Sequence, residues 1–299
     1  MTRSILIALA VVIAVFGAGL VLRDYMFSER AQPVLIPGAA GGGEVVRPAQ
    51  LTVRTVEGHV ERRGAEGEQW QPLAPNASVS EADSVRTDEG ARAVLSAGEG
   101  GMEIELAEQS ELAMKEIKHD QARVVVERGR LSAAMGKGAT KLSVGARDND
   151  AVVEAKQGAF AVLRDGDGQV AVAVTEGDVA VTAQQTRVQV GAGEQSIVAK
   201  NQPPAKPTRI PTSLFLKVSR SGPARVNQHS TELAGVTSPG AAVFVNGTPV
   251  TTDATGAFKA KVALQEGKNQ LQVTVRDAMG RNRQEQLADV TVDTQPPKL

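Results

Sequence analysis

Hydrophobic residues first gather in one unbroken run near the N-terminus. The run Ile5–Leu22 contains no charged residue and lies between Arg3 and Arg23. As a helix that rises about 1.5 Å per residue it would extend about 27 Å, enough to cross the apolar core of a thin bilayer. We therefore predict that residues 1–30 form a membrane anchor with one transmembrane helix.

Two alternatives to a retained anchor stay open. A cleaved signal peptide usually has an apolar stretch of about 7–15 residues, so this run is long for one, although the small residues Gly17–Gly19 would permit cleavage. The other alternative is a buried helix of a soluble protein. The flanking charge bias is weak, so the expected orientation depends mostly on the kind of domains that come after the run. Only Met1–Ser4 precede it, and we expect no folded cytoplasmic domain there.

The pattern changes twice after the anchor. Residues 31–50 are rich in Gly, Pro and Ala without any period, which predicts a flexible linker. From residue 51 to about residue 200, short apolar runs alternate with polar residues at a period of two, as Val170, Val172 and Val174 do. This alternation is typical of half-buried strands, and no stretch shows a sustained helical stripe.

The expected strands of residues 51–200 are short and are separated by Gly, Asp and Asn. They include Val85–Leu95, Met102–Leu106, Arg123–Glu127, Ala159–Leu163, Val170–Val174 and Val179–Thr182. Asp165–Gly168 predicts a hairpin turn between two of them. A Gly recurs just before a new strand, at Gly58, Gly129, Gly158 and Gly177. The recurrence fits a solenoid-like stack of turns or a meandering sandwich, and its irregular spacing argues against a strict solenoid.

A second β pattern begins after a short Pro-rich segment. Residues 201–212 predict an extended spacer with exposed backbone. Residues 213–299 contain about seven short strands, a number that fits an immunoglobulin-like sandwich. Asn246-Gly247 predicts a hairpin turn inside it. Alternation places Lys259 toward solvent and these residues inward: Phe258, Val262, Leu271, Val273 and Val275. The chain is therefore predicted to be all-β apart from its one transmembrane helix.

The amino-acid composition excludes several classes of partner and of chemistry. The formal net charge is −1, so a nucleic-acid partner is not indicated, because phosphate binding relies on an excess of Lys and Arg. Aromatic residues make up only 3% of the chain, with one Trp and one Tyr, which leaves few rings for stacking on bases or sugars. There is no Cys, so disulfides, thiolate metal sites, thiol nucleophiles and lipidation of a cysteine are all excluded.

Few residues qualify as candidates for chemistry. His59, His119 and His229 are far apart and flanked by polar residues, so we expect them at the surface. Asp148–Asp150 and Asp165–Asp167 resemble fragments of calcium loops but lack the full alternating ligand set, and plain turn chemistry is the favoured interpretation. The sequence therefore predicts no catalytic, cofactor-binding or metal-binding residue, no cofactor and no enzymatic activity. The residues that bind a partner stay unassigned.

The region 51–200 resembles the FecR family, named for a periplasmic iron-dicitrate sensor-regulator. The matching segments are Val56–Gly58, Val60, Gln69–Leu73, Asp83–Thr87, Gly90, Ala93–Leu95, Ile104–Leu106, Ser110, Leu112, Val124–Gly129, Val172–Val179 and Gly191–Gln195. The segment departs from the family at Glu99–Gly101 and at Gln157–Phe160, where the family usually has Asp-Gly and Gly-Thr. The resemblance implies a β domain outside the cytoplasm, with Trp70 in its core. The alternative for this single Trp is stacking on a ligand.

The last region looks like the immunoglobulin-like module of glucodextranase domain B, a non-catalytic accessory module. The matching residues are Gly235, Pro239–Ala241, Val243, Val245–Gly247, Asp253, Gly256–Phe258, Leu264, Gly267–Asn269, Val273–Val275, Asp277, Gly280 and Asp293–Pro297. The resemblance identifies a module and implies no ligand.

These observations favour a non-enzymatic binding or scaffold protein of the bacterial cell envelope. We expect it in the inner membrane as a single-pass protein anchored through residues 5–22, with its bulk in the periplasm. Its partner would be another envelope protein or a cell-wall glycan. Two alternatives stay open. One is a component of envelope signalling that acts through a membrane partner, without a cytoplasmic anti-sigma domain, and the other is an accessory protein that binds glycan or peptidoglycan.

Overall fold

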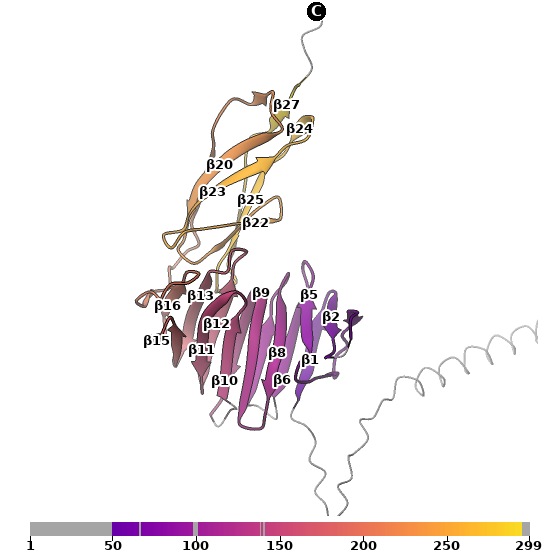
Figure 1. The fold of residues 1–299 in the computed structure, drawn as a ribbon, viewed down its shortest axis with the longest axis vertical. Coiled ribbons are helices and arrows are strands. Elements are labelled where there is room, and N and C mark those ends of the chain that lie inside the picture. Colours follow the sequence, from indigo (N-terminus) through magenta and orange to yellow (C-terminus); the bar gives the residue numbers. More distant parts are fainter. Residues whose placement is uncertain (1–49, 66, 98–100, 138, 140, 295–299) are drawn as a thin grey trace, which may run out of the picture. The chain divides into compact units, whose positions relative to one another are not determined.

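The computed structural model describes residues 50–294 except 66, 98–100, 138 and 140. The predicted anchor Ile5–Leu22 and all of the predicted linker except residue 50 lie outside the described residues. Every described element is a strand, which confirms the all-β fold class (Figure 1). No helix that could span a membrane occurs among these described residues. They belong to one of the two compact units of the chain, Ala49–Leu299.

Residues 51–209 form two sheets that face each other across one core. Sheet A has the strand order β4-β1-β6-β7-β9-β12-β13-β16-β17. Its strands are β1 Leu51–Glu57, β4 Ser78–Val79, β6 Arg92–Ala97, β7 Met102–Leu106, β9 Gln121–Met135, β12 Gly158–Arg164, β13 Val170–Glu176, β16 Glu194–Val198 and β17 Thr208–Arg209. All of its pairings are antiparallel.

Sheet B has the strand order β3-β2-β5-β8-β9-β10-β11-β14-β15. The strands not already named are β2 Val60–Arg63, β3 Gln71–Pro72, β5 Ser84–Thr87, β8 Glu111–Ile117, β10 Lys141–Ala146, β11 Asn149–Ala155, β14 Asp178–Ala183 and β15 Thr186–Gly191. Consecutive hairpins alternate between the two sheets, so β10–β11 lies in sheet B, β12–β13 in sheet A and β14–β15 in sheet B. The sandwich alternative is therefore the one that the structure has.

Strand β9 belongs to both sheets. Its first half pairs with β8 and β10 in sheet B, and its second half pairs with β7 and β12 in sheet A. The change occurs at Gly129, whose φ of 81° lies in the left-handed region that favours glycine. A Cβ there would also lie 2.7 Å from the Cα of Ser110, so a side chain does not fit.

The recurring glycines of the sequence mark the crossings between the sheets. Gly58, Gly129, Gly158 and Gly177 all have positive φ, and each lies where the chain leaves one sheet for the other. The irregular spacing of the repeat results from hairpins and strands of unequal length. Between the sheets, the inward side chains of fifteen strands form one apolar core, which includes Leu95, Ile104, Leu131, Phe160 and Val172.

The expected strand Val85–Leu95 is in fact two strands. β5 ends at Thr87 in sheet B and β6 begins at Arg92 in sheet A, with a turn at Asp88–Ala91 between them. The apolar pattern continues through this turn because Ala91 is buried beside Gly58. The hairpin turn predicted at Asp165–Gly168 is confirmed, since β12 and β13 pair as antiparallel neighbours around it.

The predicted spacer 201–212 is extended, but several of its backbone groups form hydrogen bonds with sheet A and are not exposed as expected. Thr208 and Arg209 form β17 against β16. The amide of Ala205 donates to the carbonyl of Ile197, and that of Ile210 donates to the carbonyl of Gly193. The segment therefore adds an edge strand to sheet A.

The C-terminal module, residues 213–294, consists of three small sheets. One has the order β18-β20-β23, with strands Leu216–Arg220, Ser230–Thr237 and Ala257–Ala263. The second has β19-β27-β24, with strands Arg225–Val226, Val290–Val292 and Gly267–Asn269. The third has β22-β21-β25-β26, with strands Thr248–Val250, Ala242–Val245, Gln272–Arg276 and Asn282–Gln286. Asn246 and Gly247 form the predicted hairpin turn, both with positive φ.

The core of the C-terminal module has the predicted inward residues. Phe258, Leu271, Val273 and Val275 are buried, and Val262 packs against them half-buried. Lys259 is exposed, as the alternation requires. The predicted strand register is therefore confirmed at these positions. The assignment of the module to the immunoglobulin-like fold stays a prediction.

Candidate functional site

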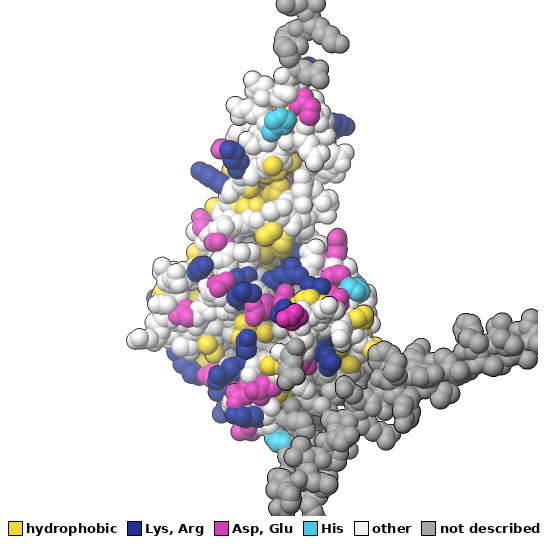
Figure 2. Space-filling view, turned by 45° about the vertical axis from the view of Figure 1, so that its right-hand side comes forward, with side chains coloured by type: hydrophobic (Ala, Val, Ile, Leu, Met, Phe, Trp, Pro, Cys, Tyr) yellow, Lys and Arg dark blue, Asp and Glu magenta, His cyan; other side chains and the backbone are white. Residues whose placement is uncertain are grey.

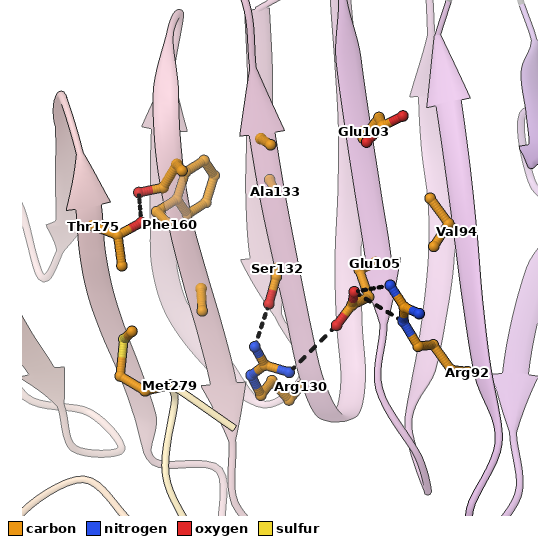
Figure 3. Close-up of a pocket in the computed structure, with 13 residues that line it drawn as sticks. Arg92, Val94, Glu103, Glu105, Arg130, Ser132, Ala133, Phe160, Thr175 and Met279 are labelled. Atoms are coloured by element: carbon orange, nitrogen blue, oxygen red, sulfur yellow. Dashed lines mark hydrogen bonds and ion pairs between the residues drawn. The ribbon is translucent and has the colours of Figure 1, made fainter. Parts of the chain in front are cut away.

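Charged side chains form a row on the outer face of sheet A. Side chains of a strand alternate between its two faces, so Arg92 on β6, Glu105 on β7 and Arg130 on β9 point away from the core (Figure 3). The Nε and Nη2 atoms of Arg92 donate to Glu105 Oε2 at 2.9 and 2.7 Å, and Arg130 Nη1 lies 3.7 Å from Glu105 Oε1. Arg92 also donates to Glu57 on β1. The row crosses four neighbouring strands.

The two arginines of this row differ in environment. The hydrogen bonds that Arg92 donates to Glu105 raise the pKa of Arg92, and the Coulombic attraction of Glu105 and the contact with Glu57 act in the same direction. Burial lowers the pKa of Arg130, against the opposing attraction of Glu105 and Asp277. A guanidinium remains protonated in proteins at neutral pH. Arg130 is therefore a largely buried cation whose charge must be balanced by hydrogen bonds.

Small side chains continue the outer face beside the charged row. Across β9 and β12, Ala134 lies opposite Ala159 and Ser132 opposite Ala161. Together with Thr175 on β13, these residues form the floor of a hollow of about 270 Å³, with Arg92, Glu105 and Arg130 on one side. A second hollow of about 380 Å³ shares Glu103, Ala134 and Ala159 with the first and continues toward Arg54 and Glu176. We call the two together the sheet A groove.

The sheet A groove ends at the C-terminal module. Met279, in the loop between β25 and β26, lines the first hollow beside Arg130 (Figure 3). Arg130 Nε donates to the carbonyl of Ala278 at 2.7 Å, and Arg130 Nη2 donates to Ser132 Oγ at 2.6 Å. Behind Met279, the outer face of β12 and β13 is covered by an apolar group that we call the junction cluster. It consists of Leu163, Ala171, Ala173, Ile210, Ala242, Phe244, Ala278 and Met279.

Polar contacts surround the junction cluster. Arg276 donates to Gln109 Oε1 at 2.8 Å and lies 3.0 Å from Glu108 Oε1, while its guanidinium lies 5.4 Å from the centre of the Phe244 ring. At the tip of the β12–β13 hairpin, Gln169 donates to Thr252 Oγ1. A Cβ on Gly166 would lie 2.4 Å from Pro249, which shows how closely this hairpin approaches the C-terminal module.

The predicted candidates for chemistry do not come together. His59, His119 and His229 are all exposed, as expected. His59 contacts Asp88 and His229 lies near Glu266. Within the described ranges, no group of three His, Cys, Asp or Glu side chains could hold a metal ion.

The side chains of the two Asp-rich segments make hydrogen bonds to turns, the first mainly to neighbouring turns and the second to its own. Asn149 donates to the carbonyls of Gly168 and Val198, and Asp150 accepts from the amide of Gln184. Asp165 Oδ1 accepts from the amides of Asp167 and Gln169, whereas its buried Oδ2 has no hydrogen-bond partner in the described structure. Burial raises the pKa of Asp165, although these two amides act in the opposite direction. Turn chemistry therefore accounts for both segments.

The prediction that Trp70 fills the core is wrong. The side chain is only half-buried and lies on the outside of the sandwich next to two guanidinium groups. Arg86 and Arg63 are 4.2 and 4.7 Å from the ring centre. The guanidinium groups of Arg63 and Arg86 lie over the ring, so cation–π attraction and partial burial of the ring stabilise this arrangement.

Sequence reasoning did not find the sheet A groove. Its residues come from β6, β7, β9, β12 and β13, and only the pairing of these strands brings them together. The sequence contains one indication of this surface. In Val170–Val174 the residues between the valines are alanines and not charged residues, which indicates that the outer face of this strand is not simply exposed to solvent. On the face drawn in Figure 2, Lys and Arg are intermixed with Asp and Glu, without a large patch of one sign.

Residues 83–180 match the model of the FecR protein family. The match covers about a third of the chain and shows a FecR domain at these residues. It confirms the predicted resemblance there, while the two sheets extend beyond it on both sides, from β1 to β17. A search of curated proteins gave no match.

Several solved structures show a distant similarity. Two structures of a proposed anti-sigma factor from Parabacteroides distasonis ATCC 8503 are 20% and 19% identical to the chain, with a TM-score of 0.36 for each. The similar part is 42% of this chain and 59% of theirs, so the chain covers less than two thirds of their length. The fibronectin(III)-like modules of Clostridium thermocellum CbhA are 10% identical over 60% of this chain and 93% of theirs, with a TM-score of 0.21. These similarities are too low to assign a function to this chain.

Proposed function

We propose that the protein is a non-enzymatic binding or scaffold component of the bacterial cell envelope. Residues 5–22 would hold it in the inner membrane, and the residues beyond 30 would lie in the periplasm. The uncharged apolar run and the FecR domain at residues 83–180 support this proposal. We further propose that the C-terminal module is immunoglobulin-like, which the alternating inward residues of its strands support.

The sheet A groove is the observation on which the binding function rests. It combines a floor of small side chains with a row of charged side chains, and these charges are paired with one another. Paired Arg and Glu side chains are suited to recognising polar groups and are poor proton donors or acceptors. Ser132 Oγ, which lies beside them, accepts a hydrogen bond from Arg130 Nη2. These paired charges therefore support a binding role for the groove.

Topology gives the first test. Protease added to spheroplasts should digest the residues beyond 30, and the protein should fractionate with the inner membrane. Protection in spheroplasts with digestion only in inverted vesicles would contradict the proposed location. A chain that leaves the membrane fraction after a high-salt wash would show that residues 5–22 are not an anchor.

A signalling role is the second candidate, and the FecR domain favours it. In this candidate function, the signal passes through a membrane partner. Purification of the full chain in detergent should then recover one membrane protein in a fixed ratio. Enrichment on isolated peptidoglycan instead would favour the alternative of a glycan-binding accessory protein.

A further inference from the structure

The outer face of sheet A already binds a stretch of polypeptide within the molecule. The loop between β25 and β26 lays Ala278 and Met279 on the alanines of β13. Arg130 donates to the main-chain carbonyl of Ala278, and a Cβ on Gly280 would lie 3.1 Å from the Arg130 guanidinium carbon. This contact therefore shows how the face recognises a chain. Small side chains lie on small side chains, and an arginine donates a hydrogen bond to a main-chain carbonyl.

The sheet A groove extends this same surface beyond the loop. It begins at Met279 and continues over the opposed pairs Ser132–Ala161 and Ala134–Ala159. Ala134 is exposed, so this part of the floor is open. Ser132 Oγ accepts from Arg130 and has no acceptor for its own proton among the described residues, which leaves a donor for another carbonyl. The groove thus repeats the features of the internal contact.

The chemistry of the lining selects among classes of partner. Phe160 is the aromatic residue of the lining, and its ring belongs to the core and is 2% exposed. A sugar ring would find no aromatic platform there. The strands of the floor are paired on both edges, so a ligand cannot join the sheet as a further strand and has to lie across its face.

We propose that the sheet A groove binds an extended segment of a partner protein that is rich in Ala, Ser and Met. The segment continues the path of the Ala278–Met279 loop, with small side chains on the alanine floor and a carbonyl over Ser132. Arg92 and Glu105 flank its polar groups. The inference specifies the partner of the binding function proposed above and rests on it.

A peptide-display library provides a direct test. The full chain, with detergent present throughout, is screened against random 12-residue peptides, and so is the variant Ala134→Trp. The exposed position should accept Trp without unfolding, and the ring fills the floor of the groove. The matched control is Ala263→Trp, which adds the same ring at an exposed position of β23. Thermal melts verify that both variants are folded.

The expected outcome is enrichment of peptides rich in Ala, Ser and Met on the wild-type chain and on Ala263→Trp. Their affinity should fall about tenfold or more on Ala134→Trp, a change that corresponds to about 1.4 kcal/mol. Three results would overturn the inference: no enriched peptide, aromatic-rich or acidic sequences, or equal binding to both Trp variants.

A second experiment distinguishes this inference from the proposed function. A photo-crosslinking amino acid is placed at position 134 or at position 263 of the full chain in cells. A partner that is captured only from position 134, and that is mapped to an extended segment with small side chains, supports the groove. Capture only from position 263 overturns the groove and leaves the binding function intact. Capture from neither position also overturns the groove, while co-purification of a partner with the full chain decides the binding function.

Discussion

The sandwich of residues 51–209 and the C-terminal module are both all-β, but they differ in how much core supports each strand. The sandwich has 37 buried hydrophobic residues in one core, whereas the module has thirteen. Each core contains one buried Phe, Phe160 in the sandwich and Phe258 in the module. Replacing either Phe by Ala removes the same side-chain volume but should destabilise the two regions unequally. The sandwich should lose part of its free energy of unfolding, and the module should lose most of its own.

The largest effect should come from Phe258→Ala. Removing a buried Phe side chain costs about 3–5 kcal/mol, a large share of the roughly 5–15 kcal/mol that stabilises a domain. Calorimetry of the full chain should show the module melting well before the sandwich. Phe160→Ala should lower the melting temperature of the sandwich without separating its parts. Lys259→Ala should change neither, and equal effects of Phe258→Ala and Lys259→Ala would show that the register of β23 is wrong.

Gly129→Ala should produce the next largest effect, and it tests the crossing of β9 between the sheets. An alanine at this φ costs about 1–2 kcal/mol, and forcing its methyl group against Ser110 adds about 1–3 kcal/mol. Gly193→Ala is the matched control, because Gly193 has a similar φ of 80° but no atom within 4 Å of the added Cβ. Chemical denaturation should place the Gly129 variant clearly below the Gly193 variant. Equal losses would mean that backbone strain alone matters at the crossing.

Arg276→Met should loosen the contact between the two regions. It removes the hydrogen bond to Gln109 and the ion pair with Glu108, and hydrogen bonds to charged groups contribute about 1.5–3 kcal/mol. We expect limited proteolysis near residues 211–213 to accelerate while each region keeps its own melting transition. The control is Lys268→Ala, which breaks an exposed ion pair with Asp289 and should leave proteolysis unchanged. Unchanged cleavage in the Arg276 variant would show that the junction cluster suffices.

The smallest effect should be the pH dependence that Asp165 contributes. Burial raises the pKa of this carboxyl in the folded protein, so folding favours its protonated form. Its contribution to stability is complete below the ordinary carboxyl pKa and is lost as the pH rises through the raised value. Asp165→Asn keeps an acceptor for the two turn amides. It should therefore be more stable than the wild type only above that range, and a constant difference across a pH series of unfolding free energies would contradict the assignment.

Much of the fold could be predicted because it depends on neighbouring residues. The alternation of Val170, Val172 and Val174 predicts a strand, and the glycines predict where strands begin. The same alternation predicted a half-buried strand, which is wrong for β13. Ala171 and Ala173 are buried as well, because Ala242 and Ala278 of the C-terminal module pack over them. A cover that comes from residues about seventy or more positions later leaves no local signal.

The candidate site was beyond prediction for a related reason. Glu105 and Arg130 can each be placed on an outer face from their strands alone. The distance between them depends on the pairing of β7 with β9. If this register were predicted wrongly by one residue, one of the two side chains would be placed in the core. Trp70 was misplaced because its sequence context suggested a core role. The two arginines that share its ring lie on β2 and β5, at positions that only the fold brings together.

Because β9 is the one described strand that both sheets share, neither sheet can detach while the other persists. The amides and carbonyls of Val124–Val126 pair with β8 and β10, and those of Leu131–Ala133 pair with β7 and β12. Local unfolding that frees the edge strands β3 or β15 would leave the hydrogen bonds of β9 intact. In hydrogen–deuterium exchange, the slowest amides of the molecule should therefore cluster on both sides of Gly129, with exchange rates set by global unfolding alone.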